Sequence, residues 1–271
     1  MESNTVLYEP TDEGITTITI NRPSVRNAVN HATSLQLAAA FERFESDSTQ
    51  KVCILTGAGT DFCAGYDLHE VARSSTDGPL AARPVDALNG GAPGPMGPSR
   101  MQLSKPVIAA VSGHAVAGGL ELALLADLRV ADATAVFGVF CRRFGVPLID
   151  GGTVRLARVV GHGRALDMIL TGRAVAAPEA LAWGLANRVV DEGALEAARA
   201  LARELLGFPQ LCMRADLASA RYAAYEARGI QDALRFEFEN GARVVALESV
   251  QGAQRFDKGV GRGGKFDKAK L

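Results

Sequence analysis

Two glycine-containing turns carry the residue types that could bind a negatively charged oxygen. Residues 62–67 (FCAGYD) and 113–121 (GHAVAGGLE) each follow a segment that is expected to be a strand. Glycine and alanine are small, so backbone N–H groups in such turns can approach a ligand closely. A helix that begins at the second turn would add the positive end of its dipole. Together the turns predict an oxyanion site, although either turn alone is common connection chemistry.

Short strands and helices must position these turns. One segment alternates polar and apolar residues with period two, and two others are short apolar runs that lead to glycine. These segments are residues 15–20 (ITTITI), 51–56 (KVCILT) and 106–111 (PVIAAV). From Thr33 to about Ser46 the apolar residues have helical spacing, behind a Thr33 and Gln36 pair that resembles a capping box. The order of strand, turn and helix predicts an α/β layer architecture.

The remaining segments differ in composition. Residues 74–100 are rich in Gly, Pro, Ala and Ser, so they are expected to be either a functional lid or a disordered insert. After about residue 190 the apolar residues recur at helical spacing. They are Leu195, Ala198, Ala202 and Leu205, and later Ile230, Leu234 and Phe238. We therefore expect a core of residues 1–190 and a C-terminal helical region of residues 191–271.

The bulk composition excludes several classes of function. The 271 residues have a formal net charge of −1, which lacks the positive field of a nucleic-acid-binding protein. Four cysteines lie far apart, which predicts reduced thiols and no metal site. The N-terminus has no basic, apolar leader, and the most apolar stretch, residues 106–126, is interrupted by glycine and charge. A cytoplasmic protein without a membrane anchor is expected.

The combination of motifs resembles the crotonase, or enoyl-CoA hydratase/isomerase, superfamily over nearly the whole chain. The motifs beside the two turns are Asn21-Arg22-Pro23 with Arg26-Asn27-Ala28, then Asp150-Gly151-Gly152-Thr153, and Ala180 with Gly184-Leu185 and Val189. The resemblance implies an α/β spiral of ββα turns with a C-terminal helical region that drives trimer formation, commonly paired into a hexamer. It also implies an acyl-CoA thioester substrate, with coenzyme A as part of the substrate and no separate cofactor or metal.

The resemblance implies a role for several residues. The backbone N–H groups of Tyr66 and Gly118 would donate to the thioester oxygen, and Glu121 would be the catalytic acid or base. Glu121 can also be read as an acidic residue in the first turn of a helix, where the dipole favours it. The residues expected around CoA are Arg26, Ala28, Ala64, Asp67 and Leu68. Phe256 and Lys265 would cover CoA from the tail.

One position departs from the family pattern. Where family hydratases carry a second glutamate, this chain has Cys141. Asp150 could replace that carboxylate, because some relatives use an aspartate close to this position, or it could be a helix N-cap. Cys141 itself is expected to line the pocket, with a nucleophilic role as the alternative. His114 is expected to pack or to form hydrogen bonds.

Several functions therefore remain open. The leading expectation is enoyl-CoA hydratase or isomerase activity. The alternatives are a dienoyl-CoA isomerase or an acyl-CoA hydrolase that uses Asp150, and a non-catalytic acyl-CoA-binding protein. A dinucleotide-dependent oxidoreductase would need a GxGxxG turn after the first strand, whereas residues 15–20 lead into Asn21-Arg22-Pro23.

Overall fold

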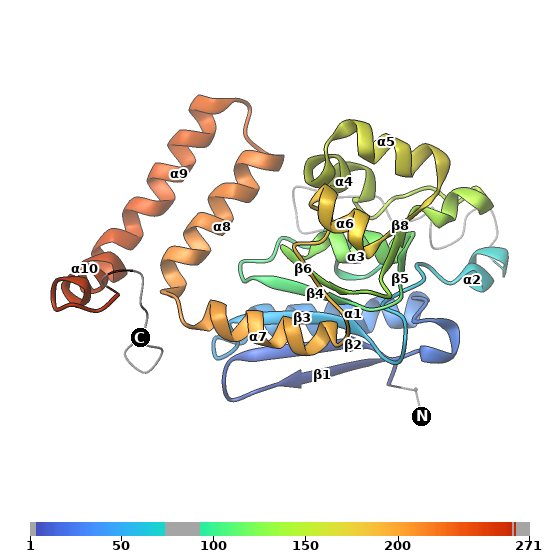
Figure 1. Ribbon diagram of the computed structural model, residues 1–271, viewed down its shortest axis with the longest axis horizontal. Coiled ribbons are helices and arrows are strands. Elements are labelled where there is room, and N and C mark those ends of the chain that lie inside the picture. Colours follow the sequence, from blue (N-terminus) through green and yellow to red (C-terminus); the bar gives the residue numbers. More distant parts are fainter. Residues whose placement is uncertain (1–3, 74–92, 262, 264–271) are drawn as a thin grey trace. The chain divides into compact units, whose positions relative to one another are not determined.

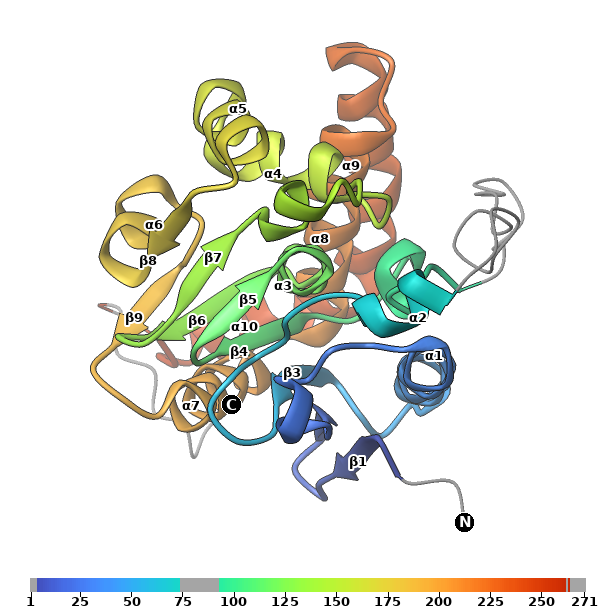
Figure 2. The ribbon, with the colours of Figure 1, turned by 90° about the vertical axis from the view of Figure 1, so that its right-hand side faces the viewer.

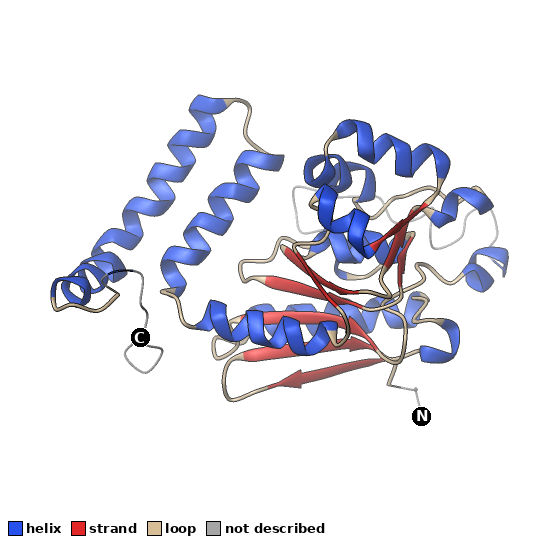
Figure 3. Cartoon of the chain, viewed as in Figure 1, coloured by secondary structure: helices blue, strands red, loops and turns tan. Residues whose placement is uncertain are grey.

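The computed structural model describes residues 4–73, 93–261 and 263. These residues form two compact units, shown in Figures 1 and 3. The first unit is residues 1–103 and 107–202, and the second is residues 104–106 and 203–271. Within the described part of the chain, no helix combines the length and the apolar character needed to cross a membrane. The boundary expected between residues 190 and 191 stays a prediction.

A six-stranded sheet forms the centre of the first unit. Strand β1 is antiparallel to β2, and every other neighbouring pair is parallel. In order across the sheet, the strands are β1 (Val6–Pro10), β2 (Ile15–Ile20), β3 (Val52–Gly57), β4 (Val107–Val111), β6 (Leu128–Asp132) and β9 (Arg188–Val190). Every residue of β2 and β4 is buried, as in strands that are covered on both faces. The three predicted strands are confirmed as β2, β3 and β4.

A second, smaller sheet has three short strands. They are β5 (His114–Val116), β7 (Val136–Gly138) and β8 (Ala174–Ala176). Figure 2 shows β5 beside β7, with which it pairs in parallel, and β8 is antiparallel to β7. The sequence predicts residues 113–121 as a single turn, which is wrong for β5, because three residues are too few to show a period of two.

Helices surround the sheets of the first unit. They are α1 (His31–Ser46), α2 (Leu68–Arg73), α3 (Gly118–Leu125), α4 (Gly152–Val160), α5 (His162–Thr171), α6 (Ala177–Trp183) and α7 (Ala194–Leu206), the last of which runs into the second unit. All eight residues of α3 are buried, so this helix is part of the core. The helix expected after the second glycine turn is therefore confirmed, and its position fixes the site described below.

Helix α1 begins two residues before its predicted start. The cap is Asn30, whose side chain accepts the N–H of Thr33 at 2.9 Å. Gln36 does not complete a capping box, because its Oε1 accepts the backbone N–H of Thr5 at 3.1 Å. The predicted Thr33 and Gln36 box is wrong, since the glutamine accepts a hydrogen bond from Thr5, the residue before β1.

The second unit consists of helices. They are α8 (Gln210–Tyr225), α9 (Ile230–Val244), a π-helical turn (Val245–Ser249) and α10 (Val250–Asp257). The rings of Tyr222 and Phe236 stack with centroids 4.1 Å apart, and the Tyr222 hydroxyl donates to Asp232 at 2.9 Å. The predicted helical C-terminal region is confirmed.

The Gly- and Pro-rich segment gives a mixed result. Residues 74–92 lie outside the described residues, so most of the predicted lid or disordered insert is not tested. Residues 94–99 are buried, and Met96 belongs to the hydrophobic core. The end of the segment is therefore packed, because glycines allow its backbone to lie directly against neighbouring elements.

Candidate active site

The two glycine turns lie side by side because their first residues pair. The Cys63 N–H donates to the carbonyl of His114 (2.8 Å between N and O), and the Val116 N–H donates to the carbonyl of Cys63 (3.1 Å). Cys63 and Ala115 form a parallel bridge. Since parallel segments run in the same direction, both turns begin at the same end of the pair.

Glycine is required where the turns approach most closely. A Cβ atom on Gly65 would lie 2.9 Å from the backbone nitrogen of Gly118 and 2.9 Å from the Cβ of Ala117. Gly65 also has φ of +100°, which residues with a side chain rarely adopt. The amide of Tyr66 follows Gly65 directly. The structure thus brings the backbone of Gly65, the residue before Tyr66, against that of Gly118, and the roles of Tyr66 and Gly118 as oxyanion donors stay a prediction.

The residue directly before α3, Ala117, has a strained backbone conformation. Ala117, the N-cap residue, has φ of 54° and ψ of −124°. Such backbone conformations cost roughly 1–3 kcal/mol in residues other than glycine, and they concentrate at functional sites. Gly118 is the first residue of α3, so its N–H has no acceptor within the helix. It lies at the positive end of the α3 dipole.

Glu121 is a buried carboxyl in the first turn of α3, with only 2% of its surface exposed. Its Oε1 accepts hydrogen bonds from the backbone N–H groups of Asp150 and Gly152, each 2.8 Å long. Burial raises the pKa of Glu121 to about 7; the charge of Asp150 adds to this rise, and the two N–H groups oppose it. A carboxyl that titrates near neutral pH can both take and give a proton there.

The raised pKa of Glu121 predicts a pH-dependent stability. The folded protein keeps a proton on this carboxyl up to about pH 7, whereas the unfolded chain releases it near 4.5. Because the folded state then binds more protons, the contribution of Glu121 to stability is complete below about pH 4.5 and is lost as the pH rises through about 7. The melting temperature of the wild type should therefore fall relative to that of Glu121→Gln across this range. A constant difference between the two would contradict the raised pKa.

Asp150 is buried but does not cap α4. The residue before α4 is Gly151, which offers no side-chain cap. The Oδ1 of Asp150 accepts the Met96 N–H (3.1 Å) and the Ser99 hydroxyl. Burial raises the pKa of Asp150, and the Ser99 hydrogen bond opposes that rise. The predicted N-cap role is wrong, because Glu121 already accepts the N–H groups at this helix end.

Cys141 lies within electrostatic reach of Glu121. It belongs to a 3-10 helix (Phe140–Phe144) and is 8% exposed. Burial raises the pKa of Cys141, the charge of Glu121 adds to the rise, and Arg142 opposes it. At neutral pH the side chain is therefore a neutral thiol, which disfavours the nucleophilic role.

His114 pairs with a carboxylate. Its Nδ1 lies 2.6 Å from Oδ1 of Asp61, and its backbone N–H donates to the same oxygen at 3.0 Å. Burial alone would raise the pKa of Asp61, but these hydrogen bonds lower it overall. The predicted hydrogen-bonding role of His114 is confirmed. Among the described residues, no cluster of His, Cys, Asp and Glu side chains could hold a metal ion.

The residues predicted to bind CoA come from two segments that pair with each other. The Ala64 N–H donates to the carbonyl of Arg26, and the Asp67 N–H donates to the carbonyl of Val29, each at 2.9 Å. This pairing brings together most of the predicted set: Arg26, Ala28, Ala64 and Asp67, with Leu68 as the first residue of α2. Phe256 lies in α10 and is exposed, and Lys265 lies outside the described residues.

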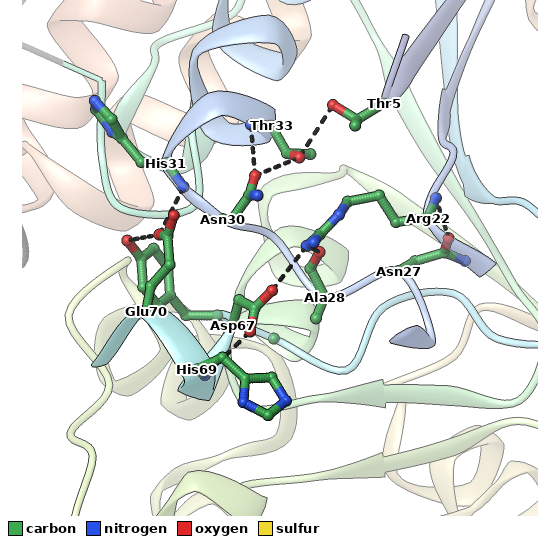
Figure 4. A network of polar contacts seen from close by, with 12 residues as sticks. Thr5, Arg22, Asn27, Ala28, Asn30, His31, Thr33, Asp67, His69 and Glu70 are labelled. Atoms are coloured by element: carbon green, nitrogen blue, oxygen red, sulfur yellow. Dashed lines mark hydrogen bonds and ion pairs between the residues drawn. The ribbon is translucent and has the colours of Figure 1, made fainter. Parts of the chain in front are cut away.

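Arg22 joins these segments, although no sequence pattern around it predicts such a role. Figure 4 shows its Nη1 between the Ala28 carbonyl (2.5 Å) and Oδ2 of Asp67 (3.0 Å). The backbone N–H of Arg22 donates to the side chain of Asn27 at 2.9 Å, and the other carboxylate oxygen of Asp67 accepts the His69 N–H at 3.1 Å. Asp67 therefore connects Arg22 to α2 and stabilises the conformation of the paired segments.

The side chain of Tyr66 is also anchored. Its hydroxyl donates to Oε2 of Glu70 at 2.7 Å, and the same oxygen accepts the backbone N–H of His31 at 2.8 Å. This chain of contacts links the first glycine turn to the start of α1. The Tyr66 phenol is thus engaged in a structural contact.

Comparisons with known proteins agree on one family. The family model described as enoyl-CoA hydratase/isomerase matches residues 10–259. Enoyl-CoA hydratase EchA19 of Mycobacterium tuberculosis is 35% identical over 246 residues, which cover 88% of each chain. Carnitinyl-CoA dehydratase of Salmonella typhi is 38% identical over 200 residues, which cover 73% of each.

Solved structures give the same result for the fold. A crystal structure of enoyl-CoA hydratase from Mycobacterium tuberculosis H37Rv superposes with a TM-score of 0.83 and 34% sequence identity, over 94% of this chain and 96% of that one. A structure of an enoyl-CoA hydratase subunit from Geobacillus kaustophilus also gives 0.83, at 31% identity, over 97% and 98%. The predicted spiral α/β fold with C-terminal helices is confirmed.

Proposed function

The chain belongs to the enoyl-CoA hydratase/isomerase, or crotonase, family, and we propose that it transfers a proton on an acyl-CoA thioester through an enolate. The observation that carries this proposal is Glu121, a buried carboxyl with a pKa of about 7 on the helix that begins with Gly118. A proton acceptor and a backbone N–H donor thus belong to one rigid, buried element, which is how a catalytic pair is kept in place.

The proposed reaction is a proton transfer by Glu121 at the carbon next to the thioester carbonyl. Glu121 takes a proton from the carbon next to the thioester carbonyl, the C–H electron pair forms the enolate double bond, and the carbonyl π electrons move to oxygen. The N–H groups of Tyr66 and Gly118 stabilise that oxygen, and one such donor is worth ~3 kcal/mol in comparable sites. In a 3-enoyl ester this enolate is conjugated with the double bond between carbons 3 and 4. When the oxygen electron pair re-forms the carbonyl, the double bond moves to carbons 2 and 3, and Glu121 returns the proton to carbon 4. Since Oε1 accepts the N–H groups of Asp150 and Gly152, Oε2 is the oxygen that would exchange the proton.

CoA would lie along the paired segments that contain Arg26, Ala28, Ala64, Asp67 and Leu68. Two main-chain hydrogen bonds and the Arg22–Asp67 ion pair hold these segments in a fixed shape. A preformed binding surface avoids the free-energy cost of ordering protein segments when the ligand binds. Arg26 is exposed, which leaves its guanidinium able to meet a phosphate.

Hydration is the second candidate reaction. Both relatives reported above are named hydratase or dehydratase, and hydration is best served by two carboxyl groups. We propose that Cys141 stands at the position of the second glutamate and that Asp150 is the second carboxyl. The charge of Asp150 raises the pKa of Glu121, which supports their proximity.

The proposal is tested with 2-enoyl- and 3-enoyl-CoA esters. Isomerisation converts the 3-enoyl ester to the conjugated 2-enoyl ester, and hydration consumes the conjugated ester, so the absorbance of the conjugated thioester separates the two. Incorporation of solvent deuterium next to the thioester reports enolate formation directly. Binding of the esters without deuterium incorporation or turnover would instead identify a non-catalytic binding protein.

Gly152 supplies a sensitive test of Glu121's position. A Cβ atom on Gly152 would lie 2.8 Å from Cγ and 2.9 Å from Oε1 of Glu121. We therefore expect Gly152→Ala to displace the carboxyl by a few tenths of an ångström and to lower kcat about tenfold. Gly163→Ala is the matched control, because its Cβ in α5 would meet no atom within 4 Å. Equal kcat values for the two variants would contradict this placement.

We also propose a homotrimer or hexamer assembled through the C-terminal helices, in the cytoplasm. Ile230, Leu234 and Phe238 recur at helical spacing on α9, and 70%, 49% and 74% of their surfaces are exposed. A row of exposed large apolar side chains on one helix supports a subunit contact. Light scattering of the purified protein measures the number of subunits.

A further inference from the structure

A tight turn between Gly94 and Gly97 places Met96 against Gly118. The N–H and carbonyl groups of the two turn glycines bond to each other at 2.9 and 2.8 Å, so Pro95 and Met96 form the tip. Met96 is 1% exposed. A Cβ atom on Gly118 would lie 2.5 Å from Sδ and 2.8 Å from Cγ of Met96. The thioether therefore lies directly against the backbone that carries one proposed oxyanion donor.

Buried polar contacts fix this turn in place. The Met96 N–H and the Ser99 hydroxyl both donate to Oδ1 of Asp150. Arg155 donates to the carbonyl of Ser99 at 2.7 Å and to that of Asp150 at 3.1 Å. Because the contacts hold the backbone at Met96 and at Ser99 after it, the position of the Met96 backbone is set by the fold.

We propose that Met96 determines which acyl groups the site accepts, an inference that rests on the proposed function. A thioester oxygen that accepts the Gly118 N–H lies about 3 Å from that nitrogen. The atoms bonded to the same carbonyl carbon then come within van der Waals distance of the Met96 side chain. Met96 fills space that a long acyl chain would need, so short acyl groups are preferred. Asp150 and Ser99 are positioning residues in this arrangement, because they act through Met96.

Binding of saturated acyl-CoA esters tests this inference without turnover. The measured quantity is the Kd of decanoyl-CoA relative to that of butyryl-CoA, by titration calorimetry on the full chain. Met96→Ala should change this ratio about tenfold or more in favour of decanoyl-CoA, since single methylene differences in apolar pockets produce effects of at least this size. Met96→Leu keeps the volume and should keep the wild-type ratio.

Two more variants separate the outcomes. Met96→Val removes fewer atoms than alanine and should shift the ratio in the same direction, which covers the case in which Met96→Ala does not fold. Ser99→Ala loosens the turn without changing the methionine, and a smaller shift of the same sign is expected. Retained binding with an unchanged ratio in the alanine and valine variants overturns the role of Met96 alone. Failure of the wild type to bind any CoA ester overturns the proposed function, and the inference with it.

Discussion

Replacing Glu121 with glutamine is expected to lower kcat about 10³-fold while the fold and the binding of CoA esters are retained. General acid–base catalysis by one positioned group contributes 10²–10⁴-fold, and an amide cannot take up the proton. Glutamine has the same shape, and its carbonyl oxygen can still accept the N–H groups of Asp150 and Gly152 that Glu121 accepts at 2.8 Å. The loss should therefore be chemical rather than structural.

The measurement is kcat on 2-enoyl- and 3-enoyl-CoA esters, together with deuterium incorporation. The pH dependence of the wild-type rate should follow a group with a pKa of about 7, and this dependence should disappear in Glu121→Gln. Asp150→Asn is the comparison, and a larger loss there would transfer the principal acid–base role to Asp150. The Kd of butyryl-CoA and the melting temperature check binding and folding. A wild-type kcat in Glu121→Gln would refute the assignment.

The pKa of Glu121 depends on two elements that are distant in sequence. Burial in α3 favours the protonated carboxyl, and the two N–H groups at the start of α4 favour the carboxylate. Neither influence alone would hold the pKa near 7, since burial without hydrogen bonds would raise it further. The packing of α4 against the first turn of α3 is therefore what adjusts the proton affinity of the site.

Local patterns in the sequence predicted the parts of the site that depend on local structure. The buried strands showed as apolar runs, and the turns at Gly65 and Gly118 showed as glycine after each run. Their glycines are needed because the backbones approach too closely for a Cβ at Gly65. The family resemblance, which rests on the same motifs, placed Glu121 beside these turns. The fold class followed from the same information.

Contacts between distant residues could not be predicted in the same way. Arg22 and Asp67 are 45 residues apart, and Asp150 and Glu121 are 29 apart. Asp150 has the local signature of an N-cap, but a carboxylate from another helix takes that role. Met96 lies in a segment whose composition suggested a loop, and only tertiary packing shows it to be buried.

Removing one proposed oxyanion donor should lower kcat nearly as much as removing the acid–base group. The backbone N–H of Gly118 can be deleted only by proline, and Gly118 is the first residue of α3. The first residue of a helix is the position that best accommodates proline, because this N–H has no partner within the helix. Proline also restricts the backbone of Ala117 before it, so the melting temperature of this variant has to be measured. Alanine is the matched control, since it adds a Cβ to the same place but keeps the N–H. For alanine, the three atoms nearest to that Cβ would all belong to the Met96 side chain, which would have to shift.

We expect kcat of Gly118→Pro to be about 10²–10³-fold below that of Gly118→Ala, the usual effect of losing one oxyanion donor. The binding of saturated acyl-CoA esters should change much less, because the enolate oxygen carries more charge than the ground-state carbonyl. Rates of deuterium incorporation measure the first quantity, calorimetry measures the second, and melting temperatures confirm that both variants fold. If the two folded variants exchanged deuterium at the same rate, the Gly118 N–H would have no part in stabilising the enolate. Other groups would then have to stabilise the charge on the enolate oxygen.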